Sequence, residues 1–489
     1  MQQGGGDGGG KRQGMLAVND LNYVLSPDLS VSVNNTYKNH FFQSTEYTHR
    51  QRGICILNTG ADYADTRTSS LEFTVRVAST NTAVAAYLGK HGSALNVIKT
   101  ITISSRSGDE IARITDLNHL SAMCNGFKFS EDWHNTVGQA AGFGGMCFQA
   151  GHGAADAQFS IPLYLLTEFF GYGRLMPAMV LAGMRIELEW EDPAVAFQAF
   201  EIGGDGAASE SINGYTIVNP YISVRAIQLT DGSQRALNEM SAVNGLEIVY
   251  CDWERTEVSA DTNRFHTEVR KAASRALKAF ASVRTNHAAS DEGKADSFST
   301  EAWDAVRWQW QLGSLYFPQQ PISNDEPRLI LPETYKHTLV ACNTYKPDVS
   351  SRSAVNFRDN ANYLQQNIAE ISTDPAVVAD VIDNLRFDTP LGKSYTDNLT
   401  TPWSEPANTR LGTAASNAGR LGTFCNGRST VAVTLERSDL FNLTGVPINN
   451  ARVLALQIEF LTTVSRKMTI FLKYVRLARV FLNNVEVEQ

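Results

Sequence analysis

Residues 184–190 read Met-Arg-Ile-Glu-Leu-Glu-Trp, and residues 454–460 read Leu-Ala-Leu-Gln-Ile-Glu-Phe. In both stretches large apolar residues recur at every second position. This period of two places one side of a β-strand on a core and the other toward solvent or a partner. The same alternation occurs at 71–77, 306–312 and 468–474. Many such short strands, separated by long polar loops, predict an antiparallel β-sandwich or barrel.

Helical patterns are scarce outside these strands. Residues 116–123 and 333–341 could each form two turns of helix. The segment 266–284 is ambiguous, because its alanines favour a helix whereas its apolar residues from 277 to 283 alternate as in a strand. The surrounding strands favour a strand here too.

The two quoted stretches also indicate an internal duplication. Ile186 and Ile458 are 272 residues apart. The same offset relates Phe159, in Phe-Ser-Ile-Pro-Leu, to Val431, in Val-Ala-Val-Thr-Leu. Each match is short, so chance is the alternative, but the shared order of the matches favours duplication.

A third match lies upstream, where His119 and His337 each stand five residues before a Cys-Asn pair, at an offset of 218. The seam then falls near 241–245, and each unit has the size of a jelly roll with long loops. We therefore expect a flexible Gly-rich arm at 1–29, a first jelly roll at 30–243 and a second at 244–489.

Composition narrows the class of protein. The 489 residues include 42 basic and 51 acidic side chains, a net charge of −9, which argues against a body that wraps nucleic acid. The charged fraction of 19% is below the usual ~25%, so much of the surface is expected to meet other protein. The sequence contains neither a run of ~18 apolar residues nor a signal peptide, which predicts synthesis and retention in the cytosol or nucleus.

Motifs for catalysis are not found, and we predict no catalytic, metal-binding or cofactor-binding residue. The six cysteines are scattered without a Cys-x-x-Cys pair and are expected to be buried free thiols. Glu187 and Glu189 could in principle form the carboxylate pair of a glycosidase. They lack an aromatic cluster for sugar, since Trp190 points to the opposite face, so a solvated strand face is the favoured interpretation.

Two groups of basic residues could touch an anionic partner. The stretch 264–284 carries six Lys or Arg residues, a pattern more typical of a solvated or subunit-facing surface than of a phosphate track. Lys11 and Arg12, on the Gly-rich arm, could contact an acidic neighbour, a membrane or the genome.

Two segments of the sequence resemble a known protein family, and this resemblance accounts for both the strands and the duplication. Residues 311–322, Gln-Leu-Gly-Ser-Leu-Tyr-Phe-Pro-Gln-Gln-Pro-Ile, and residues 175–190 resemble segments of double jelly-roll major capsid proteins of the adenovirus and tailless-phage lineage. They are most similar to those of polinton-like viruses, adintoviruses and virophages. The resemblance spans roughly residues 30 to 485.

The resemblance implies an all-β fold of two consecutive eight-stranded antiparallel jelly rolls, with long loops and few short helices. It also implies a non-enzymatic homotrimer of near-hexagonal outline that tiles the faces of an icosahedral double-stranded DNA virus. Expected partners are neighbouring capsomers, penton and minor capsid proteins, and the arm with Lys11 and Arg12 would lie on the inner face. Such a protein resides in the virion and is made in the host cytoplasm, with assembly there or in the nucleus. The alternative function is that of a cytosolic carbohydrate-binding or carbohydrate-active β-sandwich.

Overall fold

The computed structural model describes most of the chain from residue 32 onward. The described residues are 32–78, 84–88, 93–143, 147–149, 156–201, 212, 214–235, 239, 246–285, 305–323, 332–345, 430–436, 445–449, 452–460, 463, 465–480 and 485–488. Lys11, Arg12 and the predicted seam at 241–245 lie outside them.

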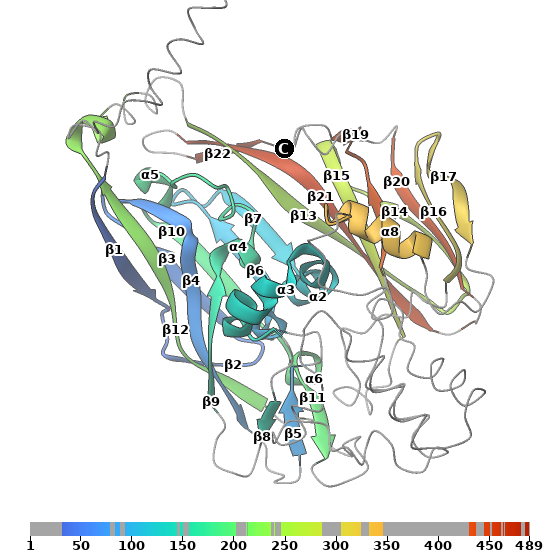
Figure 1. Cartoon of the computed structure of the whole chain (residues 1–489), viewed down its shortest axis with the longest axis horizontal. Helices are drawn as coiled ribbons and strands as arrows, with labels where there is room; N and C mark the ends of the chain where they lie inside the picture. The colour runs from blue at the N-terminus through green and yellow to red at the C-terminus, as the bar shows by residue number, and fades with distance from the viewer. Residues whose placement is uncertain are drawn as a thin grey trace, which may run out of the picture.

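The strands up to residue 229 form two main sheets and one small one (Figure 1). The larger sheet has the order β1 (Ser32–Phe41), β12 (Gly214–Leu229), β4 (Tyr63–Ala78), β9 (Asp156–Pro162), with β2 (Glu46–Thr48) beside β12. The facing sheet has the order β3 (Arg52–Leu57), β10 (Met184–Trp190), β6 (Ile98–Ser104), β7 (Glu110–Thr115). The small sheet joins β11 (Gln198–Glu201), β5 (Val84–Tyr87) and β8 (Cys147–Gln149).

The strands from residue 246 onward repeat the two main sheets. One sheet has the order β13 (Leu246–Ala260), β21 (Arg466–Val480), β15 (Ala273–Thr285), β18 (Val431–Thr434), with β19 (Val446–Ile448) beside β15 and β22 (Val485–Glu488) beside β21. The other has the order β14 (Arg264–Val269), β20 (Leu454–Phe460), β16 (Ala305–Leu312), β17 (Leu315–Ser323). Every strand pairing among the described residues is antiparallel, and none joins the first set of strands to the second.

The two sets of strands have the same order. In the larger sheet, β1, β12, β4 and β9 correspond to β13, β21, β15 and β18, and in the facing sheet β3, β10, β6 and β7 correspond to β14, β20, β16 and β17. The predicted all-β fold of two eight-stranded jelly rolls is therefore confirmed. Ile186 and Ile458 lie on β10 and β20, which occupy the same place in their sheets. The domain limits at 30–243 and 244–489 stay predictions; below, "first half" and "second half" mean the strands β1–β12 and β13–β22 with the helices between them.

The alternation that predicted the strands also places the core. The side chains of Ile186, Leu188 and Trp190 are fully buried, and those of Ile458 and Phe460 are 3% and 1% exposed. Transfer of these large apolar groups from water is the main term that stabilises each sandwich.

The segment 266–284 forms strands, as predicted, although its alanines favour a helix. β15 pairs with β21 on one side and with β18 and β19 on the other, so a full set of interstrand hydrogen bonds outweighs the helical propensity. Ala276, Ala279 and Ala281 are completely buried and belong to the hydrophobic core of the second half.

The two predicted helices are present, and several short ones were not predicted. α2 (Leu117–Lys128) is longer than the predicted 116–123, and α8 (Pro332–Ala341) contains the predicted 333–341. The unpredicted turns are η2 (Ala94–Val97), α3 (Glu131–Trp133), η3 (His134–Gly138), α4 (Leu163–Leu166), α5 (Ala178–Leu181) and α6 (Pro193–Ala196). Each has five residues or fewer, too short for a 3.6-residue hydrophobic period to be recognised. No described helix is long and apolar enough to cross a membrane.

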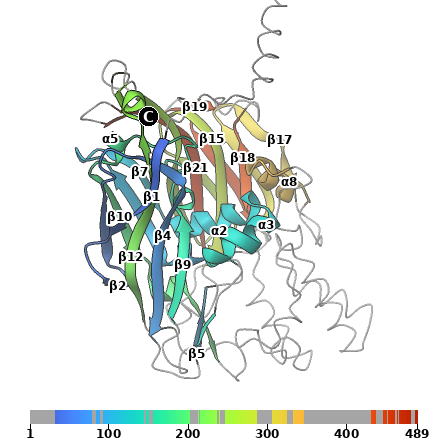
Figure 2. The ribbon, with the colours of Figure 1, turned by 60° about the vertical axis from the view of Figure 1, so that its left-hand side comes forward.

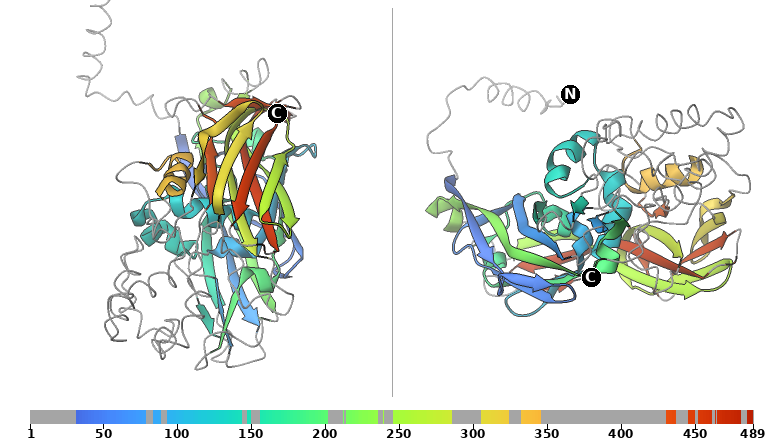
Figure 3. Two further views of the ribbon diagram at one scale, coloured as in Figure 1. Left: turned by 90° about the vertical axis from the view of Figure 1, so that its right-hand side faces the viewer. Right: turned by 90° about the horizontal axis from the view of Figure 1, so that it is seen from below.

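The two halves lie side by side, with α2 and α8 on the same side of the molecule (Figures 2 and 3). The hydrophobic core of the first half continues into the second, where it includes Tyr250, Phe280 and Phe471. A second core lies between the two sheets of the second half alone. The contact between the halves is therefore part of the packed interior.

Candidate functional site: the buried interface between the two halves

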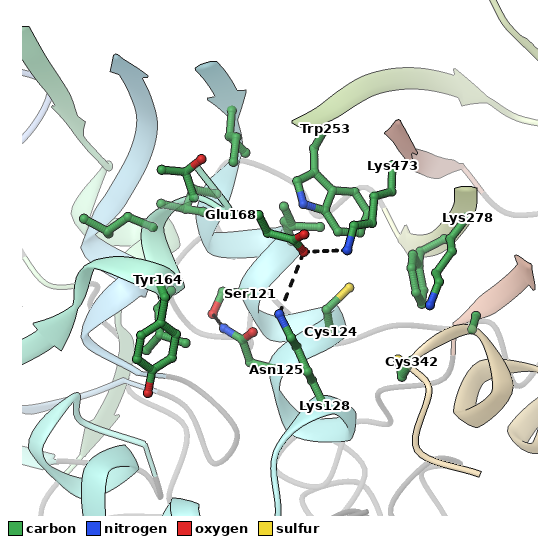
Figure 4. Close-up of a pocket in the computed structure, with 18 of the residues that line it drawn as sticks. Ser121, Cys124, Asn125, Lys128, Tyr164, Glu168, Trp253, Lys278, Cys342 and Lys473 are labelled. Carbon is green, nitrogen blue, oxygen red and sulfur yellow. Dashed lines mark hydrogen bonds and ion pairs between the residues drawn. The ribbon is translucent and has the colours of Figure 1, made fainter. Parts of the chain in front are cut away.

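A cavity of about 130 Å³ lies where the halves meet (Figure 4). The first half lines it from α2, α4 and the residues after α4, and the second half from β13, β15, β21 and the end of α8. Besides apolar side chains, the lining includes three lysines and a glutamate. Buried charges are costly unless paired, so their partners decide what the cavity does.

Glu168 and Lys473 form the central ion pair, and they come from different halves. The Lys473 ammonium donates to the Glu168 carboxylate at 2.6 Å, and Lys128 of α2 lies 3.8 Å from the same carboxylate (Figure 4). Burial opposes ionisation of Glu168, but the two lysines outweigh it and lower the pKa of the carboxyl to about 2. Glu168 is therefore a fixed anion that links α2 to β21.

A second lysine of the cavity, Lys278, has its partners within the second half. Lys278 of β15 donates to the side-chain carbonyl of Asn343 at 2.8 Å and lies 3.7 Å from the Glu436 carboxylate. Burial lowers the pKa of Lys278, and Glu436 opposes that shift. The hydrogen bond between Lys278 and Asn343 holds the end of α8 against β15.

A third group of contacts attaches the edge strand β7 to the second half. Arg476 donates to the Asp252 carboxylate at 2.9 Å and to the backbone carbonyl of Glu110 at 3.2 Å. The Tyr250 hydroxyl donates to the backbone carbonyl of Ile111 at 2.5 Å. The second half thus satisfies backbone acceptors at the free edge of a first-half strand.

Two further contacts join α2 to the strands of the second half. Arg255 of β13 lies 2.5 Å from the carboxylate of Asp116, the residue before α2, and Arg284 of β15 lies 2.8 Å from an imidazole nitrogen of His119. His337, the residue matched to His119 by the duplication, instead packs its ring against Trp308 of its own half. The matched residues therefore have different partners: His119 contacts the other half, whereas His337 contacts a strand of its own half.

Two thiols near this interface, Cys124 and Cys251, are held in the protonated form by burial. Burial raises the pKa of Cys251 to about 12 and also raises that of Cys124. Cys55 and Cys124 are buried free thiols, as predicted, whereas Cys251 and Cys342 are only partly buried. Burial of Cys147 and Cys425 is not part of what the structure describes. In the described residues, no group of three His, Cys, Asp or Glu side chains could hold a metal ion.

The carboxylates considered for glycosidase chemistry lie elsewhere, on the outer face of β10. Glu187 is 3.2 Å from Arg52 and 3.0 Å from Arg185, and Glu189 is 3.6 Å from Lys99. The hollow that contains them is lined by Arg52, Thr100, Thr102, Arg113, Glu187 and Glu189, with no aromatic ring. Trp190 is buried on the other side of the strand, as predicted. Glu187 and Glu189 are half-buried and ion-paired. The hollow around them offers no aromatic ring on which a sugar could stack.

The basic stretch 264–284 does not form a phosphate track either. Arg264 and Lys271 pair with Glu459 and Glu254, while Lys278 and Arg284 are used inside the molecule as described above. Arg264 is exposed, as a solvated surface predicts, but Lys278 is buried, which differs from the predicted surface.

Sequence reasoning missed the residues that join the halves. Lys473 and Arg476 stand in Ile-Phe-Leu-Lys-Tyr-Val-Arg-Leu-Ala-Arg-Val, at 470–480, where cations interrupt a strand that is otherwise almost wholly apolar. A cation in a strand buried on both faces needs a buried partner, so this pattern was the available signal. The partner Glu168, 305 residues away, has no such signal.

Comparison with known proteins gives a fold but no sequence relative. No family model and no curated protein matches the chain. The solved structure of VP54 of PBCV-1, fitted into a cryo-EM reconstruction of the virophage Sputnik, has a TM-score of 0.52 at 9% identity, over 96% of this chain and 99% of that chain. A quasi-atomic model of the PBCV-1 virus capsid gives 0.50 at 9% identity, again over 96% of this chain and 99% of that chain. At such identity the likeness shows the fold, which is the double jelly roll that the sequence resemblance indicated.

Proposed function

We propose that this chain is the major capsid protein of a double-stranded DNA virus, a structural subunit without enzymatic activity. The observation that carries the proposal is the pair of jelly rolls of identical strand order, fixed side by side by partly buried ion pairs such as Glu168–Lys473. The same fold forms the subunit in the PBCV-1 capsid structure.

Two similar units in one chain suit a particular assembly. Three chains around a threefold axis present six similar jelly rolls, which give the homotrimer a near-hexagonal outline. Hexagonal capsomers can tile the faces of an icosahedral shell, and many weak contacts between them add up to a stable particle. The low charged fraction of 19% is favourable for broad lateral contacts.

The remaining parts of the proposal follow from this role. Residues 30–243 and 244–489 would be the two jelly rolls, and residues 1–29 an arm on the inner face, where Lys11 and Arg12 could meet an acidic neighbour, a membrane or the genome. Partners would be neighbouring capsomers, penton and minor capsid proteins. The protein would reside in the virion after synthesis in the host cytoplasm and assembly there or in the nucleus.

Mass measurement and negative-stain electron microscopy of the purified protein test this function. We expect particles of three times the monomer mass with a near-hexagonal outline, and shells at higher concentration. A monomer at all concentrations that binds glycans would instead support the carbohydrate-binding alternative and overturn the capsid proposal.

A further inference from the structure

One polar group at the interface cavity contains the residue types that can form an amide bond between side chains. Lys278 and Asn343 line the cavity, and the Lys278 amine donates to the side-chain carbonyl of Asn343 at 2.8 Å. The Glu436 carboxylate lies 3.7 Å from the same nitrogen. Figure 4 shows the Lys278 side chain, on β15, directed toward the end of α8. An amine, a carboxamide and a carboxylate are thus brought together from three separate parts of the second half.

The backbone of Asn343 is fixed by the end of α8. The Thr344 amide donates to the Leu339 carbonyl, and the Asn343 amide donates to the Val340 carbonyl, which are the two hydrogen bonds of a Schellman motif. Asn343 has a φ of 60°, in the left-handed region that this motif requires. Glycine is the usual residue there and asparagine is the common alternative. Asparagine at this place therefore ends the helix and also presents a carboxamide to Lys278.

The strands of the second half place Lys278 beside Glu436. The pairing of β15 with β18 continues one residue beyond β18, where the Leu435 amide donates to the Leu277 carbonyl at 2.7 Å. The Lys278 and Glu436 side chains are buried, at 6% and 7% exposed. Asn343 is the exposed member of the group. The amine is therefore shielded from water, while the carboxamide lies next to solvent, into which a small leaving group could pass.

The closest partner of the buried Lys278 amine is a neutral carboxamide rather than the carboxylate. Burial lowers the pKa of Lys278, because the ammonium loses its hydration, and Glu436 opposes this shift. Burial thus increases the fraction of neutral amine, which has the lone pair that an ammonium lacks. The carbonyl carbon Cγ of Asn343 is one bond beyond the oxygen that the amine contacts. Reactants that the fold holds in contact in this way react far faster than the same groups free in solution.

We propose that Lys278 and Asn343 join in an intramolecular amide bond between Nζ and Cγ, with release of ammonia and with Glu436 as the group that carries the protons. The reaction occurs once in each chain, without turnover, and it is independent of the proposed capsid role. It requires only the folded chain, because no atom is oxidised or reduced.

The atoms and protons of this reaction balance. The Lys278 ammonium first passes one proton to the Glu436 carboxylate. The lone pair of Nζ then forms a bond to Cγ of Asn343, and the carbonyl electron pair moves onto Oδ1. When that pair re-forms the carbonyl, the Cγ–Nδ2 bond breaks, and Nδ2 takes the proton from Glu436 and leaves as ammonia. Nζ gives its second proton to the carboxylate, so the products are a secondary amide, ammonia and protonated Glu436.

The bond would change the stability of the second half. It connects residues 65 positions apart and closes the chain between them into a covalent loop. Such a loop lowers the conformational entropy of the unfolded chain and so stabilises the folded one. The bond also removes a buried ammonium, whose desolvation is costly. Asn125, the residue matched to Asn343 by the duplication, instead donates to Ser121 within α2.

Intact-mass spectrometry and peptide mapping of the folded full-length protein test the proposal. We expect the unmodified protein to be lighter than its sequence by one ammonia molecule. Digestion should yield a branched peptide that contains both Lys278 and Asn343. A folded protein at its full sequence mass would overturn the proposal. A linear peptide that has lost ammonia would also overturn it, since that product is an asparagine cyclised on its own backbone.

Three variants locate the reaction. Lys278→Arg keeps the cation, but a guanidinium is not deprotonated in proteins, so this variant should retain the full mass. Glu436→Gln removes the proton carrier and should slow the loss of ammonia by about 100-fold or more, measured as the cross-linked fraction over time. Asn125→Asp, at the matched residue of the first half, is the control and should cross-link as the unmodified protein does. Ammonia loss that persists in Lys278→Arg would refute the assignment, and an unchanged rate in Glu436→Gln would refute the role of this carboxylate.

Discussion

The first and second halves share a strand order but differ in what covers them. In the second half, Tyr250 of β13 and Arg476 of β21 contact strand β7 of the first half and are almost inaccessible. In the first half, Tyr37 of β1 lies on the face opposite the hydrophobic core and is 61% exposed. The first surface is an interior contact of the chain, whereas the second faces solvent. The two halves therefore share a strand order without sharing the surfaces that they bury.

The halves also differ in how their charges are held. The first-half pair Arg76–Asp156 spans the edge of an open sheet, and both side chains are about 40% exposed, at 43% and 38%. The interface pair Glu168–Lys473 is 25% and 17% exposed and has a second lysine beside it. Surface pairs contribute little to stability, whereas removal of one member of a buried pair strands a charge. Replacing the cation of the interface pair should therefore lower the free energy of unfolding more than replacing the cation of the exposed pair.

The largest effect is expected where the two halves are alike. Ile186→Asp and Ile458→Asp each place a carboxylate in the core of one jelly roll, at positions 0% and 3% exposed. An unpaired buried charge costs more than the stability of an ordinary domain can offset, so soluble protein should be lost in both cases. Soluble yield and size-exclusion chromatography check the result. Gln457→Asp, on the opposite face of β20, is the control and should remain soluble. Normal assembly of either core variant would contradict the strand register.

These core positions show how much the sequence could predict. The period of two at 184–190 and 454–460 identified the strands and the buried face, because alternation depends only on local geometry. The duplication then placed both strands in equivalent positions. The contact between the halves could not be predicted in the same way. Glu168 is brought to Lys473, and Asp252 to Arg476, by packing across hundreds of residues, which leaves no local pattern in the chain.

The next effect is expected at the interface charges. Lys473→Met leaves Glu168 buried with Lys128 as its remaining cation, and should lower the free energy of unfolding by about 3 kcal/mol. Urea denaturation measures this change. The double variant Glu168→Leu/Lys473→Met should recover much of the loss, because no charge is then stranded. Arg76→Met, in the exposed first-half pair, is the matched control and should change the unfolding midpoint little. Similar losses for both single variants would remove the proposed distinction between the interface and the open sheet.

A smaller effect should appear in the pH dependence. The folded protein holds the pKa of Glu168 at about 2, below the ordinary value of 4.5, so its contribution to stability is present above about pH 4.5 and is lost as the pH falls toward 2. Glu168→Gln should therefore be less stable than the parent at pH 7 but lose less stability between pH 5 and pH 3. Urea denaturation across this range measures the slope. Glu268→Gln, which removes an exposed carboxylate of β14, serves as the control. An unchanged slope in Glu168→Gln would show that this carboxylate is not held by the lysines.

The smallest effect on the folded protein is expected from the arm, which precedes only the first half. Six of the first ten residues are glycine, and ordering them is costly because glycine loses the most backbone freedom on folding. Only a partner surface could offset that cost, such as the inner face of a shell where Lys11 and Arg12 meet an anionic surface. Deletion of residues 2–13 removes none of the described strands, so trimers should form and unfold as before. Shell yield or the salt concentration that shells tolerate should fall, which electron microscopy across a salt series would measure. The double variant Lys11→Gln/Arg12→Gln separates the two possible causes: a loss equal to that of the deletion assigns the role to the charges, whereas a smaller loss assigns it to the length of the arm. Unchanged shells at the same yield after the deletion would leave the arm without a role in assembly.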